Sequence, residues 1–386
     1  MKKRFYCLLL LFTFASHINA ENKITEAQLG QILFLDSNFS ANRTMSCSTC
    51  HEPAKGFTDH RENVGHGIAS LGDDGKSFGG RNAPMAGYAN TSPSFHFDDA
   101  LKEYVGGQFW DGRANTLADQ AMGPPLNPAE MGLPNAEALV KRIQENPFYV
   151  DSFKSLYGKN VFESSSKGKV LPAFQGFANA IQAFEKTKQF ASYDSKYDRF
   201  LKGEYELTVL EDLGRTLFFS NNNVSCNSCH LLKTEDSKQE PFTNHQYRNI
   251  GVPSYADILR LAGLKADHID HGLLENPAVD DPKYDGKFKN PSLRNVAVTA
   301  PYMHNGVFKE LRTVMEFYDH YNNPERTVNP ETKKPWQSAE VPKTVDKEDL
   351  KGKALTDRKI DALVAFMKIL TDKRYESMLE EQEKSK

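Results

Sequence analysis

Cys47-Ser-Thr-Cys50-His51 and Cys226-Asn-Ser-Cys229-His230 are two stretches with one pattern, C-x-x-C-H. This pattern is the attachment signature of c-type haem. The spacing suits the chemistry, because two thiols bond the two vinyl groups of one porphyrin and the next residue places an imidazole on the iron. The sequence therefore predicts two covalently bound c-type haems, with attachment residues and iron ligands at Cys47, Cys50, His51, Cys226, Cys229 and His230.

Cysteine pairs of this spacing have other uses, and three of them compete with haem attachment. They are a structural zinc site, a redox-active dithiol and a pair of small disulfide loops. Haem is favoured because a histidine directly follows each pair and because only one of the five cysteines, Cys7, lies outside the pairs. Cys7 belongs to an N-terminal segment that we expect to be removed.

That N-terminal segment, residues 1–20, has the three regions of a secretory signal peptide. Lys2-Lys3-Arg4 supplies positive charge, Phe5 to Ala15 is an apolar run of 11 residues, and Ile18-Asn19-Ala20 ends in a small residue. An apolar run this short cannot cross a bilayer as a helix, which needs about 20 residues. We therefore expect cleavage after Ala20, export to the periplasm, where c-type haem is attached, and no membrane span.

The composition is that of a soluble globular protein. The 386 residues include 48 basic and 51 acidic side chains, for a net charge of -3. Such a balance gives no basic surface for nucleic acid, so nucleic acid is not expected among the partners. At about 150 residues per domain, the length predicts two or three domains.

An internal duplication accompanies the two haem motifs. Leu29-Gly30-x-x-Leu33-Phe34 precedes the first motif, and Leu213-Gly214-x-x-Leu217-Phe218 precedes the second. Gly56-Phe57-Thr58-Asp59 follows the first motif, and Pro241-Phe242-Thr243-Asn244 follows the second. This long-period repeat predicts two fused cytochrome c-like domains, residues 21–200 and 201–386, with a boundary between residues 190 and 207.

The expected fold class is all-α, with short helices in long irregular connections. Helical apolar spacing is clearest from Ala136 to Asn146 and from Ile360 to Ile369, with starts at Pro134-Asn135 and Thr356-Asp357. The 25 glycines and 19 prolines interrupt the rest, and few stretches alternate as strands do. Covalent haems are expected to supply much of the apolar core.

Three groups of residues bear on whether the haems carry electrons or perform a reaction. They are Gln108-Phe-Trp110-Asp-Gly-Arg113, Asn127-Pro-Ala-Glu130-Met131 and Pro291-Ser-Leu-Arg-Asn-Val-Ala-Val-Thr299-Ala-Pro301-Tyr-Met-His304-Asn-Gly306. Together they resemble the bacterial di-haem cytochrome c peroxidase superfamily. Within it the chain is most similar to the branch that completes the tryptophan tryptophylquinone cofactor of methylamine dehydrogenase. The resemblance extends over almost the whole chain after residue 20.

The resemblance implies that the haem held by His51 is the peroxide site, with Gln120 and Glu130 over its open face. A carboxylate there can move a proton between the two peroxide oxygens, and an amide can orient the peroxide. Without the resemblance, Glu130 would be interpreted as a helix-start or surface carboxylate. Trp110 resembles the tryptophan that lies between the haems in this superfamily and lets them share charge. Trp110 can also have a packing role, and the two roles are compatible.

The second haem, held by His230, has two candidates for its far ligand. In the peroxidases of the superfamily this ligand is a methionine, whereas in the cofactor-maturing branch it is a tyrosine, and the corresponding position here is Tyr318, fourteen residues after His304. Met315 is the alternative. Tyr318 is favoured because an anionic oxygen donor stabilises oxidised iron and suits the storage of oxidising equivalents.

A calcium site between the domains is also implied by the resemblance. Its ligands would be Asn82 and the carbonyl oxygens of Thr299 and Pro301. Oxygen donors suit this hard cation. A glycine-proline turn without a metal is the alternative.

Two positions complicate the resemblance. His66 lies fifteen residues after His51, near the place of a removable far histidine in the peroxidases. We favour a solvent-facing loop histidine at this position. The alternative is a closed, six-coordinate resting state of the first haem. Val224 stands where the cofactor-maturing branch has a surface tryptophan that relays oxidising equivalents. Either a nearby aromatic such as Phe218 or Phe219 replaces that tryptophan, or the substrate differs.

The resulting hypothesis is an enzyme that uses hydrogen peroxide to oxidise tryptophan residues of a methylamine dehydrogenase precursor by long-range electron transfer. The first alternative is a peroxidase that reduces hydrogen peroxide with electrons from a small periplasmic cytochrome or cupredoxin. The second alternative, from a different functional class, is a non-catalytic electron carrier with two coordinatively saturated haems.

Overall fold

The computed structural model describes residues 23–61, 65, 67–163, 171–220, 226–232 and 239–384. The predicted signal peptide, His66 and Val224 lie outside these residues. Within them, every helix is too short or too polar to span a lipid bilayer.

Two helices cross at the start and end of the first half of the chain. Helix α1 (Glu26–Leu35) begins at Thr25, whose hydroxyl accepts a hydrogen bond from the Gln28 amide in a capping box. It packs against α6 (Pro172–Glu185), and a Cβ atom at Gly30 would lie 1.8 Å from the carbonyl oxygen of Ala180. Glycine at this position therefore allows the two backbones to touch.

The second half repeats this crossing with different residues. Helix α8 (Val209–Phe218) begins with a capping box at Thr208 and packs against α12 (Asp357–Ile369). A Cβ atom at Gly214 would lie 1.9 Å from the carbonyl oxygen of Ala362. The duplicated Leu-Gly-x-x-Leu-Phe motif is thus a duplicated helix-helix contact in three dimensions.

The remaining elements are short, as expected from the many glycines and prolines. The other α-helices of the described residues are α2 (Cys47–Cys50), α3 (Leu117–Ala121), α4 (Ala136–Gln144), α5 (Pro147–Tyr157), α7 (Lys196–Leu201), α9 (Cys226–Cys229), α10 (Ala256–Leu261), α11 (Leu311–Asp319) and α13 (Glu376–Lys384). The predictions of helices at 136–146 and 360–369 are confirmed by α4 and α12, which start after Asn135 and Thr356.

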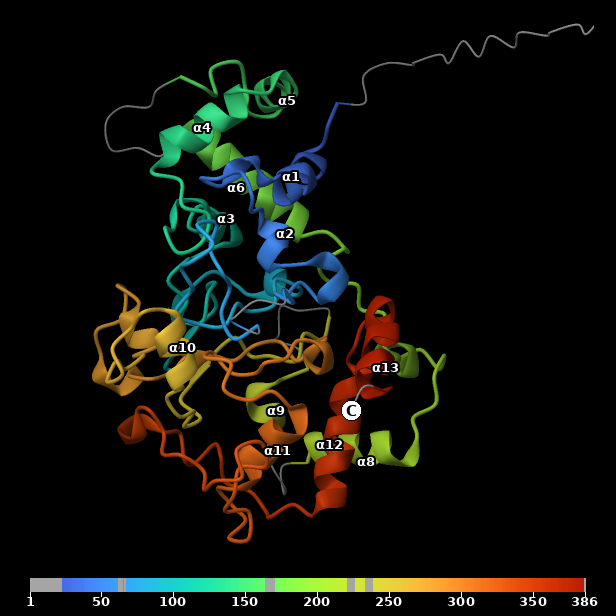
Figure 1. Ribbon diagram of the computed structural model, residues 1–386. Helices are drawn as coiled ribbons and strands as arrows, with labels where there is room; N and C mark the ends of the chain where they lie inside the picture. Colours follow the sequence, from blue (N-terminus) through green and yellow to red (C-terminus); the bar gives the residue numbers. More distant parts are fainter. Residues whose placement is uncertain are drawn as a thin grey trace, which may run out of the picture.

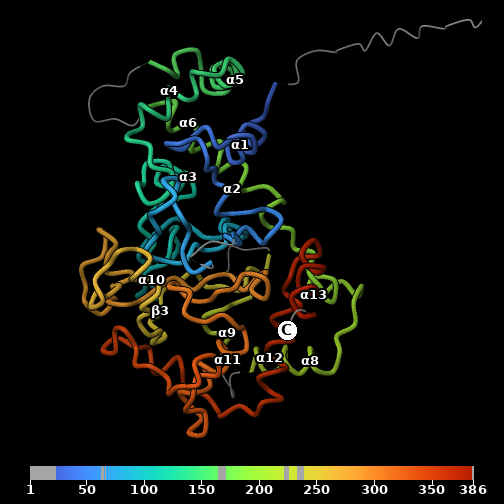
Figure 2. Tube along the Cα trace, in the orientation of Figure 1, coloured from blue at the N-terminus to red at the C-terminus, as the bar shows by residue number. Residues whose placement is uncertain are grey.

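Strands are few, and they form two small antiparallel sheets that the sequence did not indicate. Strands β1 (His96–Asp98) and β2 (Glu103–Val105) pair with Phe97 opposite Tyr104. Strands β3 (Tyr247–Arg248) and β4 (Phe288–Lys289) pair far apart in the sequence. The expectation of a helical chain with long irregular connections holds, with these sheets added (Figure 2).

Buried apolar residues gather in two main clusters, one in each half. The first runs from Leu29 to Phe190 and the second from Tyr197 to Leu370. In Figure 1, α1 to α6 lie at one end of the molecule, and α8, α9, α11 and α12 lie at the other. Side chains also cross between the halves: the Tyr88 hydroxyl donates to Asp372 over 2.5 Å.

A buried ion pair fixes the segment that leads into the centre of the molecule. Arg294 is fully buried and donates to both carboxylate oxygens of Asp198 in α7, over 2.7 and 3.0 Å. Bidentate geometry of this kind orients both partners. The chain from residue 291 to residue 306, which carries much of the family resemblance, is anchored at this point.

Candidate haem sites and the residues between them

The first C-x-x-C-H motif forms a single helical turn, α2, with His51 as the residue that follows it. Ser46 and Thr49 form a capping box at its start. No disulfide bond joins Cys47, Cys50, Cys226 and Cys229 in the structure. Among the described residues, no three His, Cys, Asp or Glu side chains are grouped to hold a metal ion.

Both motif histidines are oriented in the same way. The Nδ1 atom of His51 donates to the carbonyl oxygen of Phe57 over 3.2 Å, and Nδ1 of His230 donates to that of Phe242 over 3.1 Å. Both phenylalanines have a φ of +56°, a left-handed conformation that turns the carbonyl towards the ring. Nε2 is then the nitrogen with a free lone pair, as a metal ligand requires.

Burial keeps these two imidazoles neutral. Desolvation lowers the pKa of His51 and lowers the pKa of His230 to about 4. A neutral imidazole is the form that binds iron. Their environment therefore prepares both histidines for coordination.

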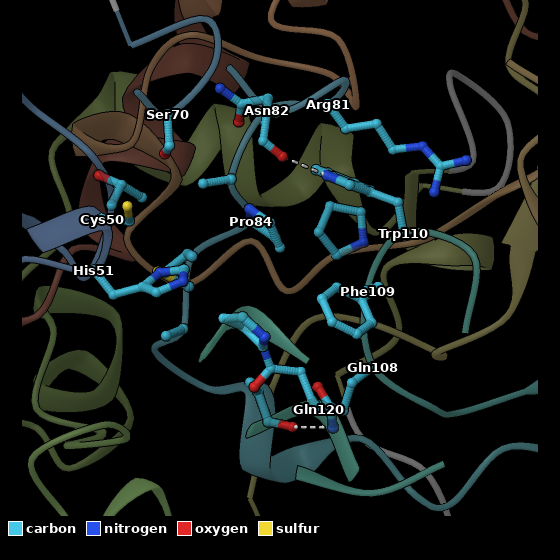
Figure 3. A pocket seen from close by; sticks show the side chains of 18 of the residues that line it. Cys50, His51, Ser70, Arg81, Asn82, Pro84, Gln108, Phe109, Trp110 and Gln120 are labelled. Atoms are coloured by element: carbon cyan, nitrogen blue, oxygen red, sulfur yellow. Dashed lines mark hydrogen bonds between the residues drawn. The ribbon is translucent and has the colours of Figure 1, made fainter. Parts of the chain in front are cut away.

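A cavity of about 610 Å³ adjoins the first motif. Cys47, Cys50 and His51 line it together with Gln120 and Glu130. The volume lies within the range of about 300–1,000 Å³ that cofactor sites occupy. Thiols, a neutral imidazole and a cavity of this size fit one c-type haem, and Figure 3 shows His51 and Gln120 around the space it would fill.

Gln120 and Glu130 reach this cavity from different elements. Gln120 lies in α3, and Glu130 lies in the turn after Asn127. The Nδ2 atom of Asn127 donates to Oε1 of Glu130 over 2.8 Å. Burial raises the pKa of Glu130, while Asn127 and Arg113 act in the opposite direction. The structure thus brings both predicted side chains to the cavity, with the carboxyl group shifted towards its protonated form.

Trp110 stands between the two halves of the site. Its indole N–H donates to the carbonyl oxygen of Asn82 over 2.8 Å, and its own carbonyl oxygen accepts from the Lys289 amide over 2.9 Å (Figure 3). It lines the first cavity and a second, smaller cavity of about 190 Å³. Seven residues form this shared wall: Trp110, Lys289, Asn290, Pro291, Val296, Tyr302 and Met303.

The second cavity is bordered by the second motif and by α11. Cys226, Cys229 and His230 line it on one side, and Met315 and Tyr318 line it on the other. The two candidates are three residues apart on a helix and therefore share a face. Burial, and then the neighbouring thiols of Cys229 and Cys226, raise the pKa of Tyr318. Loss of its proton at neutral pH therefore requires a bound cation beside it.

The three predicted calcium ligands all line the first cavity. The Nδ2 atom of Asn82 donates to the carbonyl oxygens of Gly67 and Ile68 over 2.8 and 3.2 Å, which turns its Oδ1 atom away from them. Thr299 and Pro301 line the same cavity. An amide oxygen with two carbonyl oxygens is a donor set that suits calcium.

Two titratable residues of the first cavity were not predicted from the sequence. Glu185 is 6% exposed, its Oε2 atom has no partner among the described residues, and burial raises its pKa to about 8. The only indication of Glu185 in the sequence was its position four residues after Ile181, which places an acidic side chain on the apolar face of a helix. Lys289 donates from Nζ to the Gly107 carbonyl oxygen over 2.6 Å, and burial lowers its pKa to about 8.

Comparison with known proteins agrees with this arrangement. Residues 25–206 match the family described as di-haem cytochrome c peroxidase. The chain is 47% identical over 359 residues to the methylamine utilization protein MauG of Paracoccus denitrificans, across 92% of this chain and 90% of that one. It is 32% identical over 286 residues to the cytochrome c peroxidase Ccp of Escherichia coli, across 73% of this chain and 51% of that one.

A solved structure extends the similarity to three dimensions. The diheme peroxidase BthA from Burkholderia thailandensis superimposes with a TM-score of 0.77 at 30% identity, over 91% of this chain and 86% of that one. Identity of 47% over nearly the full length of both proteins is far above what a shared fold alone would require. The chain belongs to the di-haem cytochrome c peroxidase family of haem-dependent oxidoreductases.

Proposed function

We propose that this protein uses hydrogen peroxide to oxidise tryptophan residues of a methylamine dehydrogenase precursor and so completes the tryptophan tryptophylquinone cofactor. The single observation that carries the proposal is the position of Trp110 in the common wall of two unlike cavities. One cavity has acid-base side chains and room for a small oxidant, and the other is bordered by Tyr318. The high identity to a methylamine utilization protein supports the choice of substrate.

The cofactors in this proposal are two c-type haems. Cys47 and Cys50 would hold one and Cys226 and Cys229 the other, in domains of residues 21–200 and 201–386. His51 and His230 would be the near ligands, and Tyr318 the far ligand of the second haem. The haems supply reversible loss of electrons at iron, which protein side chains cannot provide. Export directed by residues 1–20, followed by their cleavage, would place the mature protein in the periplasm, where the haems would be attached.

Three side chains of the first cavity have distinct tasks. Glu130 moves a proton from one peroxide oxygen to the other, and the rise of its pKa on burial favours this task because the carboxylate then accepts a proton more readily than an exposed one. Gln120 donates a hydrogen bond that orients the bound peroxide. Trp110 couples the two cavities through its indole ring.

Asn82, Thr299 and Pro301 would hold calcium between the two halves. Asn82 accepts from Trp110 and its amide donates to His304, so a cation on its side chain would fix both neighbours. The calcium site is thus assigned a structural task, namely to hold the indole of Trp110 between the cavities.

Reduction of peroxide with electrons from a small periplasmic cytochrome or cupredoxin is the second candidate function. The 32% identity to a cytochrome c peroxidase favours it. In that case an electron-donor protein, rather than a quinoprotein precursor, would bind the enzyme. The two functions share the peroxide chemistry and differ in where the electrons come from.

The experiment combines the ferric holoprotein with purified methylamine dehydrogenase precursor and hydrogen peroxide. The quinone absorbance of the mature cofactor should appear with the precursor, and only slow peroxide consumption should be seen with a reduced small cytochrome. Rapid steady turnover with the cytochrome and no quinone with the precursor would contradict the proposal and favour the peroxidase.

A further inference from the structure

A group of aromatic rings extends from the second cavity to the protein surface through α11. The ring of Tyr318, which borders the cavity, lies 6.0 Å from that of Phe317. Phe317 lies 5.8 Å from Trp336 and 5.1 Å from His320. Trp336 is therefore two ring contacts away from the proposed far ligand of the second haem.

Trp336 has the surroundings of an indole that can lose an electron and keep its proton. Its N–H donates to the carbonyl oxygen of Arg326 over 2.8 Å, the same kind of bond and the same length as that of Trp110 with Asn82. A carbonyl oxygen stabilises the N–H but does not take its proton at neutral pH. The ring of His320 stacks on the indole, with ring centroids 5.1 Å apart and an interplanar angle of 26°.

Trp336 also lies where a partner protein can reach it. It is half-buried, whereas its neighbours Lys333, Lys334 and Gln337 are exposed. The segment is held in place by a bridge between Val328 and Pro335. An oxidisable ring thus packs against the second core cluster and is still partly exposed at the surface.

The phenylalanines near the second motif are weaker candidates for the same task. Phe218 is fully buried and packs against Phe242 and Phe366. Phe219 contacts the same rings. A phenyl ring is much harder to oxidise than an indole, so Phe218 and Phe219 serve as packing residues. Trp336 is therefore a better candidate than either of them for passing oxidising equivalents to the substrate.

We propose that Trp336 is the residue through which oxidising equivalents leave this protein for its protein substrate, an inference that rests on the proposed function. Trp336 gives one electron towards the second cavity past Phe317 and then takes one electron from an aromatic side chain of the partner. Two such transfers, with two protons, balance the reduction of one hydrogen peroxide to two waters. Bonds are made and broken only in peroxide and in the partner.

The test compares the wild-type holoprotein with Trp336→Phe, Trp336→Tyr and Val328→Ala. Phenylalanine keeps the ring packing but removes the oxidisable group, tyrosine restores one, and Val328→Ala changes the adjacent surface only. Quinone formation in the precursor should be lost in Trp336→Phe, partly recovered in Trp336→Tyr and kept in Val328→Ala. Wild-type quinone formation in Trp336→Phe would overturn the inference.

A second readout does not depend on the precursor. With peroxide and no partner, unused oxidising equivalents should modify Trp336, which mass spectrometry of peptides detects as added oxygen. Absence of that modification in a protein that does consume peroxide would overturn the inference. A wild-type protein that modifies Trp336 but leaves the precursor unchanged would instead overturn the proposed function.

Discussion

Gly214 permits the closest backbone contact in the second half of the molecule, and its replacement by alanine is a severe test of the fold. The added Cβ atom would lie 1.9 Å from the carbonyl oxygen of Ala362, whereas real Cβ atoms essentially never approach below 3.0 Å. The obstacle is backbone, which cannot rotate away as a side chain can. Helices α8 and α12 must therefore separate by about 1 Å.

The cost of this separation follows from known overpacking effects. Extra methyl groups in packed cores cost about 1–3 kcal/mol, and a clash with backbone belongs at the upper end of that range. Alanine recovers about 1 kcal/mol through its better helix propensity. The net loss of about 2 kcal/mol should lower the melting temperature by about 4–8 °C for a unit of this size.

Thermal unfolding of the holoprotein, followed separately through the absorbance of each haem, measures this loss. Gly214→Ala should disturb the haem held by His230, and Gly30→Ala should disturb the one held by His51, because Gly30 makes the equivalent contact in the first half. Gly80→Ala is the control, since its new Cβ would meet only Leu264 at 3.8 Å. A melting temperature of Gly214→Ala equal to that of the control would show that α8 and α12 do not need a glycine at this contact.

Three further predictions concern the first cavity. Glu130→Gln keeps the acceptor for Asn127 but cannot move a proton, so stopped-flow measurement of the reaction with peroxide should show a loss of about 10²- to 10⁴-fold, and an unchanged rate would exclude Glu130 as the proton carrier. Glu185 has a pKa of about 8 in the folded protein against 4.5 ordinarily, so the folded state binds its proton more tightly. The contribution of Glu185 to the free energy of unfolding is therefore fully present below pH 4.5 and falls by about 1.4 kcal/mol per pH unit as the pH rises to 8. In denaturant unfolding, Glu185→Gln should reduce this dependence of the unfolding free energy on pH. The same pH dependence in wild type and Glu185→Gln would contradict the raised pKa of Glu185. Asn82→Ala should weaken calcium binding in titration calorimetry, and wild-type affinity in that variant would place the cation elsewhere.

Local patterns in the sequence were sufficient for much of the fold. The capped starts of α4 and α12 and the two Leu-Gly-x-x-Leu-Phe helices are set by neighbours a few residues apart, so they could be predicted. The pairing of β3 with β4 could not, because each strand has two residues and their partners lie about forty positions apart.

The candidate site divides in the same way. The motif histidines were evident from spacing, but the carbonyl groups that orient them come from Phe57 and Phe242 in a left-handed conformation, which composition does not reveal. Glu185 was missed because a single acidic residue on an apolar helix face is indistinguishable from an exposed one until the helix is packed. Trp336 lies eighteen positions after Tyr318, and its contacts with Phe317 and His320 form only when the chain folds back onto α11.

We propose that the two haem sites are unlike and that Tyr318 is the far ligand of the second iron. Resonance Raman spectra of the ferric wild type, Tyr318→Phe and Met315→Leu test it most directly. Phenolate vibrations should be present in the wild type and in Met315→Leu and absent in Tyr318→Phe. Spectra that are unchanged in Tyr318→Phe and altered in Met315→Leu would put sulfur on the second iron and exclude Tyr318 as its ligand.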